Sequence, residues 1–206
     1  MSSERHEYSV IFFLLTVGLL VLSTVIVGAV VIVWGLHTYK ITSNSMNPTL
    51  WAGDITFVEK FTYCFSQPKR GDVVVFSTDG LSVPPDLPWC QRTIGVPGDV
   101  LEVKSGRIHV NGCPLSECKP PVGPTDLIAY DPHLHYPDFQ YLTHDGDKLI
   151  VPGGTYFLIC DRLTDTIDSR WFGPVPRGNI LGRVAAIWHS DHWRLSVLLG
   201  WPLPSR

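Results

Sequence analysis

No run of like charges occurs in this 206-residue sequence, and charged residues make up only 17% of it, with a formal net charge of -3 at pH 7. Proteins that bind nucleic acid usually carry a basic face, so we expect no nucleic-acid partner. Metal-ligand patterns are also scarce. His133 and His135 have no third ligand in register, and no second cysteine pair follows Cys113 and Cys118 at zinc-finger spacing. The sequence therefore predicts neither a metal nor a cofactor.

Cysteine is present five times, an odd number that leaves at least one thiol outside any disulfide. Cys113 and Cys118 are close enough in the chain to close a small loop as a disulfide. Such a bond forms in an oxidising compartment, so the sequence leaves both states of this pair open.

Asp, Glu, Lys and Arg are absent from Tyr8 to Tyr39, and the stretch Val10–Leu36 is almost wholly apolar. A helix needs roughly 20 apolar residues to cross the hydrocarbon core of a bilayer. A cleaved secretory signal is the alternative, but its apolar region runs only about 7–15 residues. We therefore interpret residues 10–36 as a retained transmembrane anchor in contact with membrane lipid, preceded by a short tail over residues 1–9. The basic residues that flank the anchor nearly balance, so the positive-inside rule leaves its orientation open.

Short β-like runs fill the rest of the chain, separated by turns that are rich in its 17 prolines and 18 glycines. The runs are Asp54–Phe61, Val73–Phe76, Val100–Val103, Arg107–Val110, Tyr156–Cys160 and Arg183–Trp188. Such short strands between turns predict a mostly β, antiparallel domain of small sheets or an irregular barrel over residues 40–206. Residues 119–148 are interpreted as a variable surface excursion. The tail Trp188–Pro204 is either a final strand with a packed end or a segment that contacts the membrane surface.

Four segments after the anchor carry groups that can do chemistry. In chain order they are Ser43-Asn44-Ser45-Met46-Asn47-Pro48-Thr49-Leu50, Lys69-Arg70-Gly71-Asp72-Val73-Val74-Val75-Phe76, Gln91-Arg92-Thr93-Ile94-Gly95-Val96-Pro97-Gly98-Asp99 and Asp168-Ser169-Arg170-Trp171-Phe172-Gly173-Pro174-Val175-Pro176. Taken alone, the pair Ser43 and Ser45 indicates little, because serines so placed usually make turns or helix caps. Four such segments in this order behind an anchor are far more specific.

The order of these segments resembles that of the type I signal peptidases, serine endopeptidases that remove signal peptides from exported proteins, over about residues 10–190. The resemblance implies the signal peptidase fold, a mostly β, antiparallel domain behind one N-terminal transmembrane helix. It also implies that Ser45 is the nucleophile, and that the Ser43 hydroxyl and the backbone N–H of Ser45 form the oxyanion hole. Such donors stabilise the tetrahedral intermediate by roughly 3–4 kcal/mol each.

The resemblance also assigns supporting residues and a substrate. Asp168, Ser169 and Arg170 match the segment that buttresses the site, and Thr166 matches a hydroxyl residue that orients the base. Arg92 is counted with the supporting residues and cannot itself act as the base, because a guanidinium stays protonated. The implied substrates are signal peptides of preproteins, bound extended along a strand edge. The implied location of the domain is the outer, periplasmic or extracytoplasmic, face of the inner or plasma membrane.

One position departs from the family pattern, because Gln91 stands where the family keeps its catalytic lysine. A buried lysine amine can take the serine proton since burial lowers the lysine pKa, whereas an amide has no useful basicity. General-base catalysis contributes about 10²–10⁴-fold to a rate. Gln91 is therefore predicted to orient Ser45 without deprotonating it.

Three explanations account for the missing base. The chain is a catalytically impaired pseudo-peptidase that binds signal peptides or partners, or a distant base reaches the site, or water and the surroundings of the substrate accept the proton and turnover is slow. The candidate distant bases are His133, His135, His144 and Lys104. The sequence thus predicts a membrane-anchored serine endopeptidase of the signal peptidase I type, with the pseudo-peptidase as the alternative.

Overall fold

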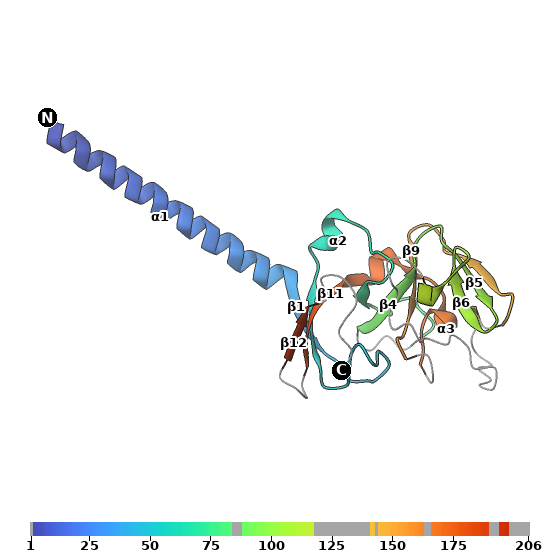
Figure 1. Ribbon diagram of the computed structural model, residues 1–206. Coiled ribbons are helices and arrows are strands. Elements are labelled where there is room, and N and C mark those ends of the chain that lie inside the picture. The colour runs from blue at the N-terminus through green and yellow to red at the C-terminus, as the bar shows by residue number, and fades with distance from the viewer. Residues whose placement is uncertain are drawn as a thin grey trace. The chain divides into compact units, whose positions relative to one another are not determined.

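The structure is a computed structural model that describes residues 2–83, 88–117, 141–142, 144–162, 166–189 and 194–197. It shows one long helix, α1, and a set of short strands (Figure 1). The chain divides into two compact units, residues 1–37 and residues 38–206. The strand pairs described in the second unit are antiparallel, so the predicted mostly β, antiparallel fold is confirmed. The boundaries predicted for the tail, the anchor and the surface excursion stay predictions.

Helix α1 spans Ser2–Gly35 and contains the segment Ile11–Val30, whose mean hydropathy is 2.6. Its 20 residues are enough to cross the hydrocarbon core of a bilayer. Apolar residues surround the helix instead of forming one stripe, and the described side chains of this segment are almost all exposed within the chain. A helix that is apolar on every side needs an apolar environment, and the bilayer interior fits this segment.

The larger sheet joins eight strands of the described chain in the order β1-β2-β11-β3-β4-β9-β10, with β12 also paired to β11. Their bounds are β1 Leu36–Lys40, β2 Ile55–Glu59, β3 Val73–Phe76, β4 Trp89–Gly95, β9 Thr155–Ile159, β10 Val175–Pro176, β11 Ile180–His189 and β12 Arg194–Val197. The register shifts in β11 between Val184 and Ala186, and in β4 between Thr93 and Gly95. Because such irregularities bend a strand and increase its twist, the sheet curves at β4, the strand that carries Gln91.

The smaller sheet has the strand order β7-β6-β5-β8. Its strands are β5 Val100–Lys104, β6 Arg107–Val110, β7 Cys113–Pro114 and β8 Lys148–Ile150. Leu101, Val103 and Ile108 of this sheet share one buried cluster with Ile94 of β4 and Phe157 of β9. The smaller sheet therefore packs on the β4–β9 part of the larger one and helps to hold these two strands in place.

Four short helical turns connect the strands of the described chain. They are α2 Thr62–Phe65, η1 Leu115–Glu117, α3 Ser169–Phe172 and η2 Arg177–Asn179, of which η1 and η2 are 3₁₀ helices. Asp168 caps α3, because its side chain accepts a hydrogen bond from the backbone N–H of Arg170 at 3.0 Å. This cap fixes the start of the segment that was predicted to buttress the site.

The predicted β-like runs agree well with the strands. Val73–Phe76 and Arg107–Val110 coincide with β3 and β6, and the other runs differ from their strands by one to three residues at an end. Strand β4 was not predicted, because its burial pattern shows five consecutive buried residues that include polar side chains. No period-two alternation marks such a strand. In the tail, β12 agrees with the interpretation of a final strand.

An apolar cluster fixes the turn that carries Ser45. Met46 and Leu50 are 1% and 0% exposed and pack with Val58, Val75 and Ile187 of β2, β3 and β11. Full burial of a side chain of this size stabilises by about 1.5–3 kcal/mol. These two residues therefore hold the turn on the sheet while their neighbour Ser45 stays partly exposed.

Candidate active site

The turn over residues 43–50 presents Ser45 through a set of backbone hydrogen bonds. The N–H of Leu50 donates to Met46 O at 2.9 Å, and the N–H of Asn47 donates to Asn44 O at 3.2 Å. The carbonyl of Ser45 accepts from the N–H of Arg162 at 2.9 Å. The segment that follows β9 is therefore tied directly to the residue predicted as the nucleophile.

The structure brings the hydroxyls of Ser43 and Ser45 together, while the oxyanion hole assigned to the Ser43 hydroxyl and the Ser45 N–H stays a prediction. Their hydroxyl oxygens lie 3.0 Å apart, at hydrogen-bond distance. Ser43 is exposed and Ser45 is half-buried, so both hydroxyls can reach a bound substrate. The pair can place one hydroxyl on a carbonyl carbon and the other beside the oxygen that becomes negative.

Gln91 lies on β4 and is only 2% exposed. Its Nε2 donates to the carbonyl of Ile167 at 2.8 Å and to Cys160 Sγ at 3.4 Å. Its Oε1 is buried and has no hydrogen-bond partner among the described residues. The expected role of Gln91 in orienting Ser45 stays a prediction, since the bonds of its amide nitrogen go to Ile167 and Cys160.

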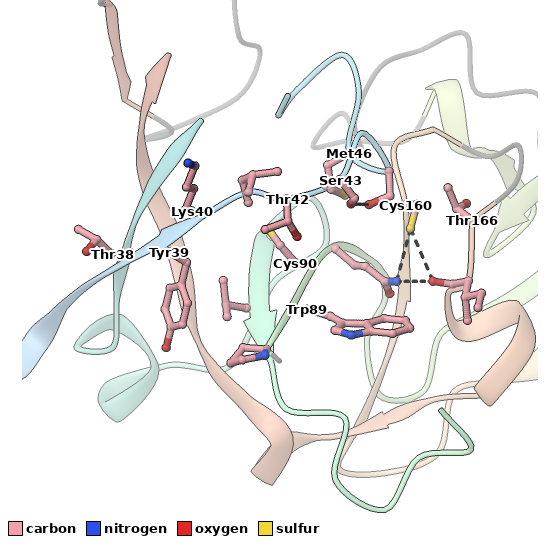
Figure 2. Close-up of a pocket in the computed structure, with 16 residues that line it drawn as sticks. Thr38, Tyr39, Lys40, Thr42, Ser43, Met46, Trp89, Cys90, Cys160 and Thr166 are labelled. Atoms are coloured by element: carbon pink, nitrogen blue, oxygen red, sulfur yellow. Dashed lines mark hydrogen bonds between the residues drawn. The ribbon is translucent and has the colours of Figure 1, made fainter. Parts of the chain in front are cut away.

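Cys160 is the unexpected member of the site. It directly follows β9, is 2% exposed, donates from its thiol to Ile167 O at 3.7 Å, and lines the same groove as Ser45 and Thr166. Figure 2 shows Ser43, Cys160 and Thr166 together at one end of a groove. Burial raises the pKa of the Cys160 thiol above its ordinary value. The group next to Ser45 is therefore a neutral thiol at physiological pH.

A buried network ties the Ser45 turn to strands β4 and β9. Arg92 is 1% exposed and pairs with Asp161, with its Nε 2.7 Å from Oδ1 and its Nη2 2.6 Å from Oδ2. Arg92 Nη2 also donates to Thr49 Oγ1 at 2.9 Å, and the Thr49 hydroxyl donates to the Asp161 carboxylate. Because Thr49 belongs to the same turn as Ser45, this ion pair positions the serine.

The predicted supporting residues also lie beneath the site. The Asp168 carboxylate binds the Arg170 guanidinium at 2.8–2.9 Å and accepts from the N–H of Cys160 at 3.3 Å. Ser169 Oγ accepts from the N–H of Leu158 in β9 at 3.0 Å. The Thr166 hydroxyl donates to Arg162 O at 2.8 Å. All of these contacts hold the chain around Cys160 and Ser45, while the roles assigned to the residues stay predictions.

A groove of about 690 Å³ opens in front of these groups. Its walls include the edge strand β1 and the residues that follow it, Ser45, Trp89 of β4, and the segment 166–167. The lining residues are Thr38, Tyr39, Lys40, Ile41, Thr42, Ser43, Ser45, Met46, Val75, Pro88, Trp89, Cys90, Gln91, Cys160, Thr166 and Ile167. Most of these side chains are apolar or neutral, so the groove suits an extended apolar peptide.

Basic side chains are scarce in the described part of this groove. Lys40 is the one basic residue among its lining residues, and Figure 2 shows it well away from Ser43 and Cys160. Lys104 pairs with Glu102 at 2.8 Å, His144 lies 3.8 Å from Asp147, and neither lines the groove. His133 and His135 lie outside the described residues, as do Cys118 and most of the excursion 119–148.

Sequence reasoning missed Cys160, Asp161 and Thr49 as parts of the site. Asp161 could have been found from the sequence, because a carboxylate that directly follows a buried strand needs a positively charged partner. Arg92 is a candidate partner. Cys160 carried no such signal, because only the pairing of β4 with β9 places it across from Gln91.

Comparison with known proteins gives the family of the chain. A family model described as signal peptidase, peptidase S26, matches residues 14–189. Signal peptidase I of Leptolyngbya laminosa is 35% identical over 170 residues, covering 78% of this chain and 75% of the relative. Signal peptidase I V of Bacillus subtilis is 32% identical over 147 residues, covering 71% of this chain and 82% of the relative. A solved signal peptidase I from Enterococcus faecalis gives a TM-score of 0.40 at 22% identity, covering 58% of this chain and 97% of its own.

The match begins inside the apolar helix and includes the Ser45 turn, strands β4 and β9, and the buttress that ends in α3. It covers most of the chain and of the relatives alike. The chain has the antiparallel β fold and the order of motifs that its sequence predicted. It belongs to the signal peptidase family, peptidase S26.

Proposed function

We propose that this chain is a membrane-anchored serine endopeptidase of the signal peptidase I type, with Ser45 as the nucleophile that cleaves signal peptides from exported proteins. The observation that carries the proposal is the Ser43–Ser45 pair, whose hydroxyls lie 3.0 Å apart at the wall of an apolar groove. The groove would hold the signal peptide in an extended form beside the segment 38–43.

The reaction follows from the two hydroxyls. Ser45 Oγ would attack the scissile carbonyl carbon, and the Ser43 hydroxyl with the backbone N–H of Ser45 would stabilise the oxyanion. The peptide C–N bond then breaks, the amine leaves with a proton, and the signal peptide stays on Ser45 as an ester. A water molecule hydrolyses this ester and restores the hydroxyl of Ser45.

The serine proton needs an acceptor in this scheme. The Gln91 amide is not basic, and Lys40 is the one basic residue described in the lining of the groove. We propose that the proton passes to solvent, in which case turnover should be slower than with an amine base by about 10²–10⁴-fold.

The non-basic Gln91 favours a second candidate function. A catalytically impaired member of the family would use the groove to bind signal peptides or a partner without cutting them. Gln91 supports this candidate because its amide is not basic and its nitrogen donates to Ile167 O and Cys160 Sγ.

Cleavage and binding should be measured together on the full-length chain in detergent micelles. The substrate is a preprotein with a fluorescent label on its signal peptide, which reports binding by anisotropy and cleavage by product mass. The proposal expects slow cleavage that falls at least about 10³-fold in Ser45→Ala. Ser82→Ala, an exposed serine outside the groove lining, should cleave like the native chain.

Three outcomes are informative. Cleavage that survives Ser45→Ala would refute the nucleophile assignment. Tight binding with no product at any time would support the second candidate instead. For the location, protection of the domain from protease added to the outside of spheroplasts would contradict our proposal that it lies on the outer face of the membrane.

A further inference from the structure

Cys160 and Gln91 are direct neighbours across the strand ladder. Arg92 of β4 pairs with Ile159 of β9 in the antiparallel register, so Gln91 and Cys160, one step further along both strands, face each other. Both side chains are 2% exposed, and Gln91 Nε2 lies 3.4 Å from Cys160 Sγ. The thiol also donates to Ile167 O at 3.7 Å, and Cys160, Gln91 and Ser45 line the same groove.

Only the nitrogen of the Gln91 side-chain amide has hydrogen-bond partners among the described residues. The carbonyl of Ile167 and the sulfur of Cys160 receive the Nε2 hydrogens, whereas Oε1 is buried without a partner. Swapping the amide oxygen and nitrogen would not help, because two carbonyl oxygens would then face each other at 2.8 Å. Buried polar groups without partners are rare in folded proteins. The groups around the end of this side chain therefore suit a donor better than an amide.

A side chain that only donates is the better match. An ammonium group has three donors and no acceptor, so it would use Ile167 O and leave no oxygen without a partner. A lysine side chain is one bond longer than glutamine, by about 1.5 Å. Extended along the line from Gln91 to the sulfur, its nitrogen would come within about 2 Å of Cys160 Sγ, since the present separation is 3.4 Å. Such a contact is far shorter than any hydrogen bond.

We infer that Cys160 is a positioning residue, whose sulfur fills the space beside Ser45 and decides that residue 91 carries an amide and not an amine. The pair Gln91 and Cys160 thus acts as one unit, in which the identity of one side chain sets the identity of the other. Removing the sulfur would free space for an amine in the part of the groove that Ser45 also lines. An amine so buried has a lowered pKa and can act as a general base.

The test is a double-mutant cycle on the full-length chain in detergent, with preprotein cleavage as the assay, which rests on the proposed function. Gln91→Lys alone should raise kcat/KM less than about 10-fold, because its amine is crowded by the sulfur. Cys160→Ala alone should give no increase. The pair Gln91→Lys with Cys160→Ala should rise by at least about 10²-fold over the native chain, the low end of general-base catalysis.

A pH profile separates positioning from a general effect on stability. In the pair, log kcat/KM should rise between about pH 6 and pH 9 and then level off, as a buried lysine amine loses its proton. Neither single variant should show this plateau. The matched control is Gln91→Lys with Cys90→Ala, which removes another groove-lining thiol from the neighbouring position on β4 and should give no increase.

Gln91→Lys with Cys160→Gly is the second version of the pair, and thermal unfolding identifies which versions are folded. The inference is overturned when Gln91→Lys alone matches the pair, when a folded pair is no faster than the native chain, or when the Cys90 control is equally activated. An inert native chain with an active pair supports the inference and counts against the proposed turnover of the native chain. Activity of the pair that survives Ser45→Ala would instead refute the nucleophile assignment.

Discussion

Asp161→Asn removes one charge from the buried ion pair that holds the Ser45 turn. In the native chain the side chains of Arg92 and Asp161 are 1% and 0% exposed, and two N–H···O bonds of 2.6 and 2.7 Å join them. Asparagine keeps the size of the side chain but turns one carboxylate oxygen into an amide donor. The buried Arg92 guanidinium would then lose the counter-charge of Asp161, and the Thr49 hydroxyl would lose a charged acceptor.

Breaking a buried ion pair by removing one partner costs about 3–5 kcal/mol, because the remaining charge stays desolvated. In a domain of this size, 1 kcal/mol lowers the midpoint of thermal unfolding by roughly 2–4 °C. We therefore expect a decrease of about 6–20 °C for Asp161→Asn. Thr49→Val should lower the midpoint less, because it removes hydrogen bonds and leaves the ion pair in place.

The assay is thermal unfolding of the full-length chain in detergent, followed by circular dichroism. Glu102→Gln is the control, because Glu102 forms its ion pair with Lys104 at the surface and its loss should leave the midpoint near the native value. The same Asp161 variant should also have a lower kcat, since the Ser45 turn loses its link to β4 and β9. A thermal unfolding midpoint of Asp161→Asn equal to that of the native chain would contradict our account of Arg92 and Asp161 as a buried, charged pair.

Three other predictions follow from separate parts of the structure. Ser43→Ala should lower kcat by about 10²–10³-fold with little change in KM, because one oxyanion donor is lost; an unchanged kcat in steady-state kinetics would remove Ser43 from the mechanism. Gly182→Ala should lower the free energy of unfolding by about 1–3 kcal/mol in a urea titration, because its Cβ would lie 2.7 Å from the backbone oxygen of Glu59; an unaltered midpoint would contradict the close approach of β11 and β2. Burial raises the pKa of the Cys160 thiol and raises that of Cys90 to about 12, so these thiols keep their protons in the folded state while unfolded thiols lose theirs near pH 8.5. The free energy of unfolding should therefore be constant below about pH 8.5 and fall above it, by at most about 1.4 kcal/mol per pH unit for each thiol. Urea titrations at several pH values should show a shallower fall for Cys160→Ala. An identical slope would contradict the burial of this thiol.

The sequence pattern was sufficient where apolar residues follow a simple period. The long uncharged stretch predicted the helix that contains Ile11–Val30, and runs such as Val73–Phe76 predicted strands with correct bounds. These features arise from burial of apolar groups, which composition and spacing report directly. The order of the four motifs likewise identified the family that the comparisons support.

Strand β4 was not predicted because its side chains are buried for a different reason. Gln91 and Arg92 have polar partners on β9 and the segment after it, and those partners are some 70 residues away in the chain. A polar residue looks the same in sequence whether water or a distant carboxylate satisfies it. The pairing of Gln91 with Cys160 could not be predicted for the same reason, since it depends on the register of β4 against β9.

The most direct measurement of the central claim is the site at which a signal peptide becomes attached. The full-length chain is mixed with a signal-peptide ester that carries a good leaving group, the reaction is stopped with acid, and the acylated residue is mapped by mass spectrometry. Our account predicts the acyl group on Ser45, with no labelling in Ser45→Ala. An acyl group on Cys160, or on any other residue while Ser45 stays unmodified, would contradict it.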